Sequence, residues 1–306
     1  MTAGAPSQQP EQAERGSDNS SSNRPTGVYA GFRTFVREDP AALVGGVLLA
    51  TIVVSAVLAP VIAPHGPLAQ DQFHVGAGSS GSHLLGTDQL GRDIFSRLVY
   101  GARSSLLIGA GSVLLALVVG TVFGTLAGYY GGRVDAVISA AIDLVLAFPL
   151  LILAILVVIV LGPNLWNVIF AISVSQFPVF VRVARSLALS LRQREFVEAS
   201  ISLGSSDLKV MRKHVLPNVL PLMMVQATTT IGLAILSGAA LSFLGIGLQP
   251  PTPDWGRMVS ELGVFVFTRP ELPFYPGAAI ALTVVAANLL GDGLVKIADP
   301  LGRRVL

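Results

Sequence analysis

The sequence predicts an all-α, polytopic membrane protein with six transmembrane helices. Only 12% of its 306 residues are charged, about half of the ~25% that is usual in soluble domains. Hydrophobic residues make up 52% of the chain, and the mean hydropathy is +0.69. Several stretches without a charge are long enough for a helix to cross the ~30 Å hydrocarbon core of a bilayer. These observations exclude an ordinary soluble domain.

The absence of cysteine and the composition of the N-terminal segment narrow the possible classes of protein further. The chain has no cysteine, which excludes a disulfide framework, a thiolate zinc site and a cysteine nucleophile. Residues 1–30 are rich in Gln, Ser, Asn, Gly and Pro without apolar periodicity, so we expect a disordered cytoplasmic tail there. No apolar segment begins close to the N-terminus, so we expect no cleaved signal peptide.

The first three predicted spans are separated by one long loop and one tight turn. Residues 41–64 carry no charge and form the first helix. A polar loop rich in Gly and Ser follows over residues 65–103, so that residues 31–103 comprise the first helix and an extracytoplasmic loop. Within this loop, residues 93–100 favour an amphipathic helix at the membrane interface. The nearby charges either pair among themselves or meet a docked partner; they are Asp88, Arg92, Asp93 and Arg97. Residues 104–130 and 136–161 form the second and third helices.

Three further spans complete the count of six. Residues 165–181 form the fourth helix, the fifth falls within residues 220–248, and residues 274–290 form most of the sixth. We group the last five helices as a core over residues 104–297. A short cytoplasmic C-terminal tail, residues 298–306, follows this core.

The distribution of Lys and Arg residues predicts the orientation in the cell (plasma or inner) membrane. With six spans, both termini lie on one side, and that side holds 15 of the 20 Lys and Arg residues. Because cytoplasmic segments carry the excess of positive charge, we expect both termini and the segment between spans four and five to be cytoplasmic. The excess of Lys and Arg residues therefore reflects membrane topology and not binding to nucleic acid.

A charged island lies between the fourth and fifth spans. Residues 195–217 read as two short amphipathic helices joined at Gly204, which can adopt the left-handed conformation that ends a helix. Residues 205–207, Ser-Ser-Asp, offer N-cap residues for the second helix. Pro217 suits the first turn of the helix that follows. An amphipathic pair of helices that belongs neither in lipid nor in a core of its own needs a partner surface.

The spacing within this island resembles a family signature. Glu198-Ala199-Ser200, Gly204 and His214-Val215-Leu216-Pro217 stand as in the cytoplasmic loop of the membrane subunits of binding-protein-dependent ABC importers. Ser200 and His214 depart from the general pattern, which has alanine and isoleucine there. The resemblance implies that residues 190–217, here called the signature loop, dock into a groove on a separate ATPase subunit. The residues expected at this contact are Glu195, Phe196, Val197, Glu198, Ala199, Ser200, Leu203, Gly204, Asp207, His214 and Pro217. We expect Phe196, Val197 and Leu203 to fill the groove, and Glu198 and nearby Arg residues to set the register.

Other segments are similar to the dipeptide, oligopeptide and nickel branch of these permeases. They are residues 83–105, 243–250, 253–256 and 299–304, so the likeness covers roughly residues 35–306. It implies a C-type membrane subunit with the type I ABC importer permease fold, which forms half of a translocation pathway for di- or oligopeptides. The partners implied are a homologous B-type permease, two cytoplasmic ABC ATPases, an extracytoplasmic substrate-binding protein and the lipid bilayer.

We expect this chain to be a non-catalytic subunit. A phosphate-binding loop ends in Gly-Lys-Ser/Thr, but none of the chain's three lysines follows a glycine. ATP and magnesium would then be used by the partner ATPases, and we expect no cofactor or metal bound by this chain. The His-Glu-x-x-His motif of zinc proteases is absent. The Gly-x-Ser-Gly match at residues 78–81 lies in a polar loop, where a flexible turn is the simpler interpretation.

Two residues of the predicted third helix are structural or gating candidates. Asp143 is the one ionisable residue well inside a span, where a charge costs about 2.5–3.5 kcal/mol on insertion scales. One interpretation is an ion pair with Arg133, Arg182 or Arg185, and the other is a role in the conformational change. Pro149 should kink the helix, either as a packing feature or as a hinge.

The sequence does not identify the transported substrate. Nickel or glutathione are alternatives to peptides within the same machinery, because specificity in such systems resides largely in the binding protein. A proton-coupled secondary transporter is a further alternative, but it would need internal repeats and paired intramembrane ionisable groups. The sequence shows neither feature, and it does not identify the ATPases or the sister permease.

Overall fold

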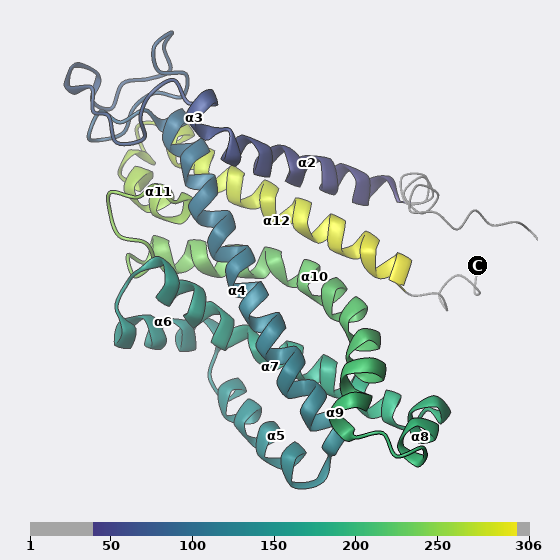
Figure 1. The fold of residues 1–306 in the computed structure, drawn as a ribbon. Helices are drawn as coiled ribbons and strands as arrows, with labels where there is room; N and C mark the ends of the chain where they lie inside the picture. The colour runs from purple at the N-terminus through teal and green to yellow at the C-terminus, as the bar shows by residue number, and fades with distance from the viewer. Residues whose placement is uncertain (1–38, 299–306) are drawn as a thin grey trace, which may run out of the picture.

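The computed structural model describes residues 39–298 and shows a helical chain (Figure 1). Within these residues, extended pairing is limited to two isolated bridges, Gln70 with Arg92 and Thr87 with Asp93. Five helices are long and apolar enough to cross a membrane, and a sharply bent helix pair adds a sixth span if it is counted as one. This agrees with the predicted fold class. The predicted N-terminal tail and nearly all of the predicted C-terminal tail lie outside the described residues.

The helices follow one another with short connections, apart from the loops before α4 and α11. In chain order they are α2 (Pro40–Val57), α3 (Ala59–Ile62), η1 (Gln72–His74), α4 (Ile94–Tyr130), α5 (Gly132–Leu146), α6 (Leu150–Leu161), α7 (Leu165–Arg192), α8 (Glu195–Ser202), α9 (Asp207–Val210), the π-helical segment η2 (Met211–Val215), α10 (Leu216–Phe243), α11 (Trp255–Leu262), η3 (Gly263–Phe265) and α12 (Glu271–Ala298).

The long helices form one bundle whose two ends differ (Figure 1). The loop between α3 and α4 lies at one end together with α11, and α8 and α9 lie at the opposite end. α12 packs between α2 and α10, and α4 packs against α7 and α10. Asp39 caps α2 by accepting a hydrogen bond from the backbone N–H of Ala42. Its other carboxylate oxygen lies 2.6 Å from Lys296 Nζ, which ties the start of α2 to the end of α12.

The second span is a single helix that begins at Ile94 and not at residue 104. The prediction of a separate interfacial helix over residues 93–100 is therefore wrong, and the domain boundary expected at residue 103 falls inside α4. Asp93 starts the helix, because its Oδ2 accepts a hydrogen bond from the Ser96 N–H at 2.8 Å. Ile94 is buried in an apolar cluster with Trp255 of α11 and does not lie on a lipid surface.

The charges around the start of α4 form a buried network. Arg92 Nε lies 2.6 Å from Asp88 Oδ2, and Arg97 Nε lies 3.7 Å from the same oxygen, so the predicted local pairing is present. Both guanidinium groups also contact Glu261 of α11, at 2.9 and 3.0 Å. Glu261 is absent from the predicted set, since it stands 164 residues after Arg97 in the chain. Pairing matters here because a buried charge that loses its partner destabilises a fold by about 3–5 kcal/mol.

A further buried carboxylate, that of Asp254, joins α11 to α4. Its Oδ1 accepts a hydrogen bond from Ser105 Oγ at 2.8 Å, and its Oδ2 caps α11 by accepting from the Arg257 N–H at 3.2 Å. Burial raises the pKa of the Asp254 carboxyl, although the hydrogen bonds from Ser105 and the helix backbone oppose this shift. α11 is thus fixed to α4 by hydrogen bonds as well as by apolar packing.

The predicted third helix is in fact two helices. α5 ends at Leu146, α6 begins at Leu150, and their axes meet at 91°. Pro149 has an extended backbone at the start of α6 (φ −55°, ψ 133°). Proline lacks the N–H that would continue the helix and disfavours helical geometry at the residue before it. The expected kink in a continuous helix is therefore a full break.

α4 and α7 make the most extensive contact in the bundle. Gly120, Gly124 and Gly128 follow one another at helical spacing on α4 and lie directly against α7. A Cβ at Gly124 would stand 2.5 Å from Val181 O and 2.6 Å from the Cβ of Ala184. Small residues at such positions let two helix backbones approach closely, as is usual in membrane bundles.

Candidate functional site

The signature loop forms a short helical hairpin at the end of the bundle, next to the last turns of α4 and α7 (Figure 1). α8 ends at Ser202, and Gly204 follows with φ +79°. The left-handed backbone predicted for Gly204 is confirmed. The Ser205 N–H donates to the carbonyl of Ser200 at 3.1 Å, which closes the end of the helix. A residue with a side chain would be strained at Gly204 even though the space around it is open.

The second half of the hairpin continues without a break into α10. Ser206 takes the N-cap position of α9, and Asp207 begins the helix. η2 and α10 follow directly, so residues 207–243 make one long helical segment. Pro217 lies in the first turn of α10, as predicted. A displacement of this half of the hairpin therefore moves the start of a membrane span.

Two contacts attach the hairpin to α4. The Tyr129 hydroxyl donates to Asp207 Oδ1 at 2.9 Å. Arg192, at the end of α7, donates to the backbone carbonyl of Tyr129, and its guanidinium group stands 5.5 Å from the centre of the Tyr129 ring. Tyr129 thus touches both the start of α9 and the helix that leads into α8. Tyr129 was not predicted as a site residue, since it lies outside the signature loop. Arg192 lies within that loop but was not named among the expected contact residues.

The apolar side chains of the hairpin divide into two sets. Val197 is fully buried and belongs to the main apolar cluster with Val210 and Val215. The prediction that Val197 contacts a partner surface is therefore wrong, because this side chain fixes α8 to its own chain. Leu203 is 87% exposed and Leu208 is 60% exposed. An exposed apolar surface of this kind is typical of an interaction site.

The structure brings the predicted site residues together on this hairpin. Phe196 is exposed, and its ring centre lies 6.1 Å from that of His214, which is half-buried. The remaining predicted residues differ in exposure, with Ser200 half-buried and the others exposed. The exposed ones are Glu195, Glu198, Ala199, Leu203, Gly204, Asp207 and Pro217.

Two ion pairs join α5 to α7. Arg182 lies 3.1 Å from Asp143 Oδ1, so Asp143 pairs with one of the three arginines expected. Both side chains are mostly exposed, at 61% and 68%. Arg185 forms a bidentate ion pair with Asp135, in which Nε donates to Oδ1 and Nη2 donates to Oδ2 at 2.6 Å. Asp135 was not predicted, because it follows a turn and reads as an ordinary charge of the first helical turn.

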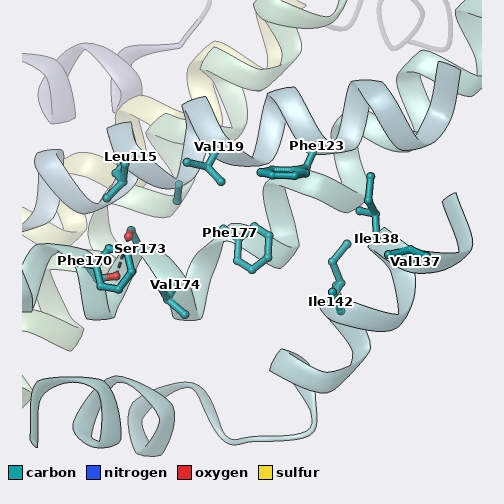
Figure 2. Close-up of a pocket in the computed structure, with 12 residues that line it drawn as sticks. Leu115, Val119, Phe123, Val137, Ile138, Ile142, Phe170, Ser173, Val174 and Phe177 are labelled. Carbon is teal, nitrogen blue, oxygen red and sulfur yellow. Dashed lines mark hydrogen bonds between the residues drawn. The ribbon is translucent and has the colours of Figure 1, made fainter. Parts of the chain in front are cut away.

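A cavity of about 430 Å³ lies between α4, α5 and α7 (Figure 2). Its walls are apolar, and the hydroxyl of Ser173 is already bonded to the carbonyl of Phe170 at 2.7 Å. Such a lining suits lipid or the apolar side chains of a neighbouring subunit rather than a substrate with charged ends. The labelled residues in Figure 2 are Leu115, Val119, Phe123, Val137, Ile138, Ile142, Phe170, Ser173, Val174 and Phe177.

Comparison with known protein families identifies the family to which this chain belongs. The family described as "binding-protein-dependent transport system inner membrane component" matches residues 120–304, more than half of the chain. The chain belongs to this family of membrane permeases. A second family, described as the N-terminal transmembrane domain of oligopeptide transport permease C, matches residues 32–75 of the permease. The predicted family and the predicted multi-pass membrane character are both confirmed.

Curated relatives and a solved structure agree with this assignment. The permease is 41% identical over 265 residues to a dipeptide transport system permease protein of Alkalihalophilus pseudofirmus, covering 87% of each chain. It is 42% identical over 267 residues to a glutathione transport system permease protein of Escherichia coli, covering 86% of this chain and 88% of the relative. The fold resembles a chain of the inward-facing MetNI methionine ABC transporter with a TM-score of 0.55 at 20% identity, covering 67% of this chain and 98% of that one. The type I importer fold is thus confirmed.

Proposed function

We propose that this permease is the C-type membrane subunit of an ATP-driven importer for di- and oligopeptides. The observation that carries the proposal is the hairpin of the signature loop, which presents Leu203, Leu208 and Phe196 to solvent at the end of the bundle. The described part of the chain does not cover them. The identity to a dipeptide permease along most of the chain supports peptides as cargo.

In this proposal the hairpin transmits force and does no chemistry. Two cytoplasmic ABC ATPases bind ATP and magnesium, and one of them receives the hairpin in a surface groove. When the ATPases close, the hairpin moves, and α4, α7 and α10 move with it because Tyr129, Arg192 and the continuous η2–α10 segment attach them. The pathway lies between this permease and a homologous B-type permease. Both termini then face the cytoplasm, and a substrate-binding protein docks at the opposite end.

The first test replaces an exposed apolar contact residue. Leu203→Asp removes a side chain whose burial in a groove would be worth about 2 kcal/mol, which corresponds to roughly 30-fold weaker docking. We expect the reconstituted complex of both permeases, the ATPases and the binding protein to lose substrate-stimulated ATP hydrolysis and uptake. Ser202→Asp is the matched control, because it adds the same charge at the exposed neighbouring position. Normal coupling in Leu203→Asp would show that the hairpin is not the docking site.

The second test addresses the backbone at Gly204. Gly204→Val forces a β-branched residue into a left-handed conformation, which costs at least 1–2 kcal/mol, and should uncouple hydrolysis from uptake. Gly204→Asn should restore most coupling, since asparagine tolerates that conformation. Glu198→Lys should also uncouple if this exposed carboxylate sets the register of docking. Insertion into the membrane should be unchanged in all three variants, as judged by the amount of protein extracted.

Glutathione is the second candidate cargo, because relatives of that name match this chain as well as the dipeptide relatives do. Uptake into proteoliposomes that contain the full complex separates the two. Dipeptide uptake that unlabelled dipeptide, but not glutathione, competes away supports the main proposal, and the reverse result supports glutathione. Uptake that continues without ATP when a proton gradient is present would contradict both.

A further inference from the structure

Three of the four histidines of the chain meet in the loop between α3 and α4. His65, His74 and His83 lie there with two carboxylates, Asp71 and Asp93. This loop is at the end of the bundle opposite the signature loop (Figure 1). The spacing of these residues in the sequence matches no metal-binding motif, so the cluster exists only because the loop folds back onto the first turn of α4.

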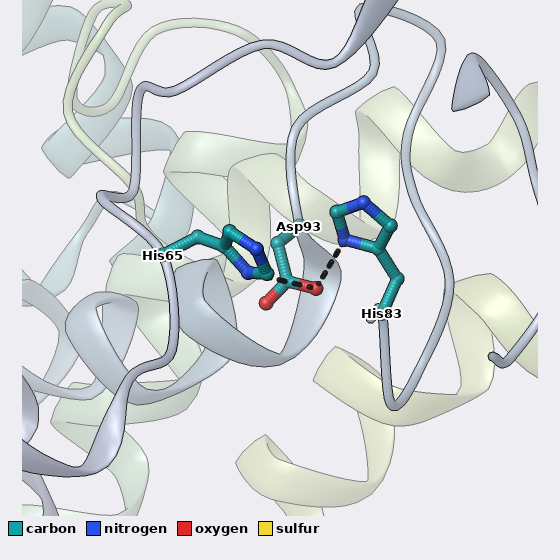
Figure 3. A group of neighbouring side chains, drawn as sticks. All are labelled: His65, His83 and Asp93. Carbon is teal, nitrogen blue, oxygen red and sulfur yellow. Dashed lines mark hydrogen bonds and ion pairs between the residues drawn. The ribbon is translucent and has the colours of Figure 1, made fainter. Parts of the chain in front are cut away.

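The ligand-type atoms of three residues converge on one point, as Figure 3 shows. His83 Nδ1 lies 3.0 Å from Asp93 Oδ1, and His65 Nδ1 lies 4.0 Å from the same oxygen. The two imidazole rings are stacked, with their centres 4.8 Å apart. The side chains of His83 and Asp93 are only 4% and 1% exposed. The His65 side chain is 36% exposed, so two nitrogens and one carboxylate oxygen stand together beside a cavity that opens to solvent.

One of these three atoms has no hydrogen-bond partner among the described residues. Asp93 Oδ2 accepts the hydrogen bond that caps α4, and Asp93 Oδ1 is hydrogen-bonded to His83 Nδ1. His65 Nδ1 is buried and has no hydrogen-bond partner among the described residues. Buried polar atoms nearly always have a partner, and leaving one without costs about 1–3 kcal/mol. A cation between His65, His83 and Asp93 would remove that cost.

We propose that His65 Nδ1, His83 Nδ1 and Asp93 Oδ1 bind a divalent transition metal, and that Zn²⁺ fits the donor set best. Two histidines and one carboxylate are an established zinc set that leaves a fourth position for water. Bonds of about 2.0–2.2 Å at tetrahedral angles place neighbouring ligand atoms roughly 3.3 Å apart. The observed separations are 3.0 and 4.0 Å from Asp93 Oδ1, and the three ligand atoms lie within 4.8 Å of one another, so side-chain rotations that draw the two histidine nitrogens together complete the site.

The neighbouring residues supply the outer contacts that such a site needs. Asp71 Oδ2 lies 3.6 Å from His83 Nε2 and 2.8 Å from His74 Nδ1. A metal-bound histidine usually donates its second N–H to a carboxylate, which fixes the ring orientation. Asp71 Oδ2 lies just beyond hydrogen-bond distance of His83 Nε2, so a small shift of the loop would give Asp71 this role for His83. A cavity of about 450 Å³ lined by His65, Asp71, His83 and Asp93 gives the metal a route from solvent.

The site would be structural and independent of the cargo. It joins residues 65 and 83 of a loop that has little regular structure to the N-cap of α4. Two of the three ligands are buried, which favours retention of a metal, whereas a transported ion has to be released. The inference therefore holds whether or not the proposed peptide cargo is correct.

The test uses the full-length chain in detergent micelles with an affinity tag that lacks histidine. After chelator treatment and dialysis against Zn²⁺, we expect one zinc per chain by elemental analysis. His65→Ala and His83→Ala should lose it, and the conservative His65→Gln should lose it while keeping the elution volume of the native protein. His214→Ala is the control, because the fourth histidine lies on the signature loop, and it should retain one zinc. Zinc should raise the apparent Tm of the wild type and not that of His65→Gln.

Several results would overturn the inference. Wild-type protein that binds no zinc, or binding that is equal in all variants, would exclude a specific site. Loss of zinc in His74→Ala with full binding in His65→Ala would show that Asp71, His74 and His83 hold the metal instead, and that the ligand set proposed here is wrong.

Discussion

The contact between α4 and α7 can be tested by adding a single methyl group. In Gly124→Ala the new Cβ would stand 2.5 Å from Val181 O and 2.6 Å from the Ala184 Cβ. Ordinary contacts of a Cβ are 3.4–4 Å, so the two helices would have to separate by about 1 Å. Overpacking of this kind costs about 1–3 kcal/mol.

Gly277→Ala is the matched control, because a Cβ at Gly277 of α12 meets nothing within 4 Å. That variant should be neutral or gain up to about 1 kcal/mol from the higher helix propensity of alanine. The difference between the two variants is therefore about 1–4 kcal/mol, or roughly 2–8 °C in apparent Tm if each kcal/mol shifts Tm by about 2 °C. The assay is thermal unfolding of the purified permease in one detergent at one scan rate. Equal Tm values for the two variants would refute the close approach of α4 and α7.

The other predictions concern three carboxylates. Glu261→Ala should lower the apparent Tm, since it leaves the buried Arg92 and Arg97 with Asp88 as their remaining partner at a cost of up to about 3–5 kcal/mol, whereas the exposed Glu271→Ala should have little effect. Asp254 has a pKa raised by burial, so its contribution to stability is fullest below about pH 3.8 and falls as pH rises through the folded-state pKa. Asp254→Asn should remove this fall in a Tm–pH profile, and an unchanged profile would contradict the raised pKa. Asp143→Asn breaks an exposed pair worth at most about 1 kcal/mol, so a changed transport rate with an unchanged Tm would show that Asp143 acts in the transport cycle.

The spans could be predicted from the sequence because hydropathy alone determines them. The residues at which the spans begin and end could not be predicted in this way. The sequence predicts that Arg92 and Arg97 pair locally or meet a docked partner, yet both also contact Glu261 on the distant helix α11 and are buried at the start of α4. Proline at position 149 predicts a disturbance, but the size of the bend depends on how α5 and α6 pack.

The sequence predicted where the candidate site lies in the chain, but not which of its side chains are exposed. Spacing places the signature loop and the turn at Gly204 correctly. It does not show which side of an eight-residue helix faces inward, and for that reason Val197 was assigned to the wrong side. Tyr129 carries no motif, and only the fold brings its hydroxyl to Asp207. The histidine cluster likewise depends on the path of a loop without sequence periodicity.

The uninterrupted course of α4 has a mechanical consequence. α7, α10 and α12 each contain an interior proline, at positions 178, 221 and 276, whereas α4 contains none over its 37 residues. At 1.5 Å per residue it is a stiff rod about 55 Å long. Asp93 stands at one tip and Tyr129 near the other, so a tilt imposed on either face of the membrane reaches the opposite face with little lost to bending.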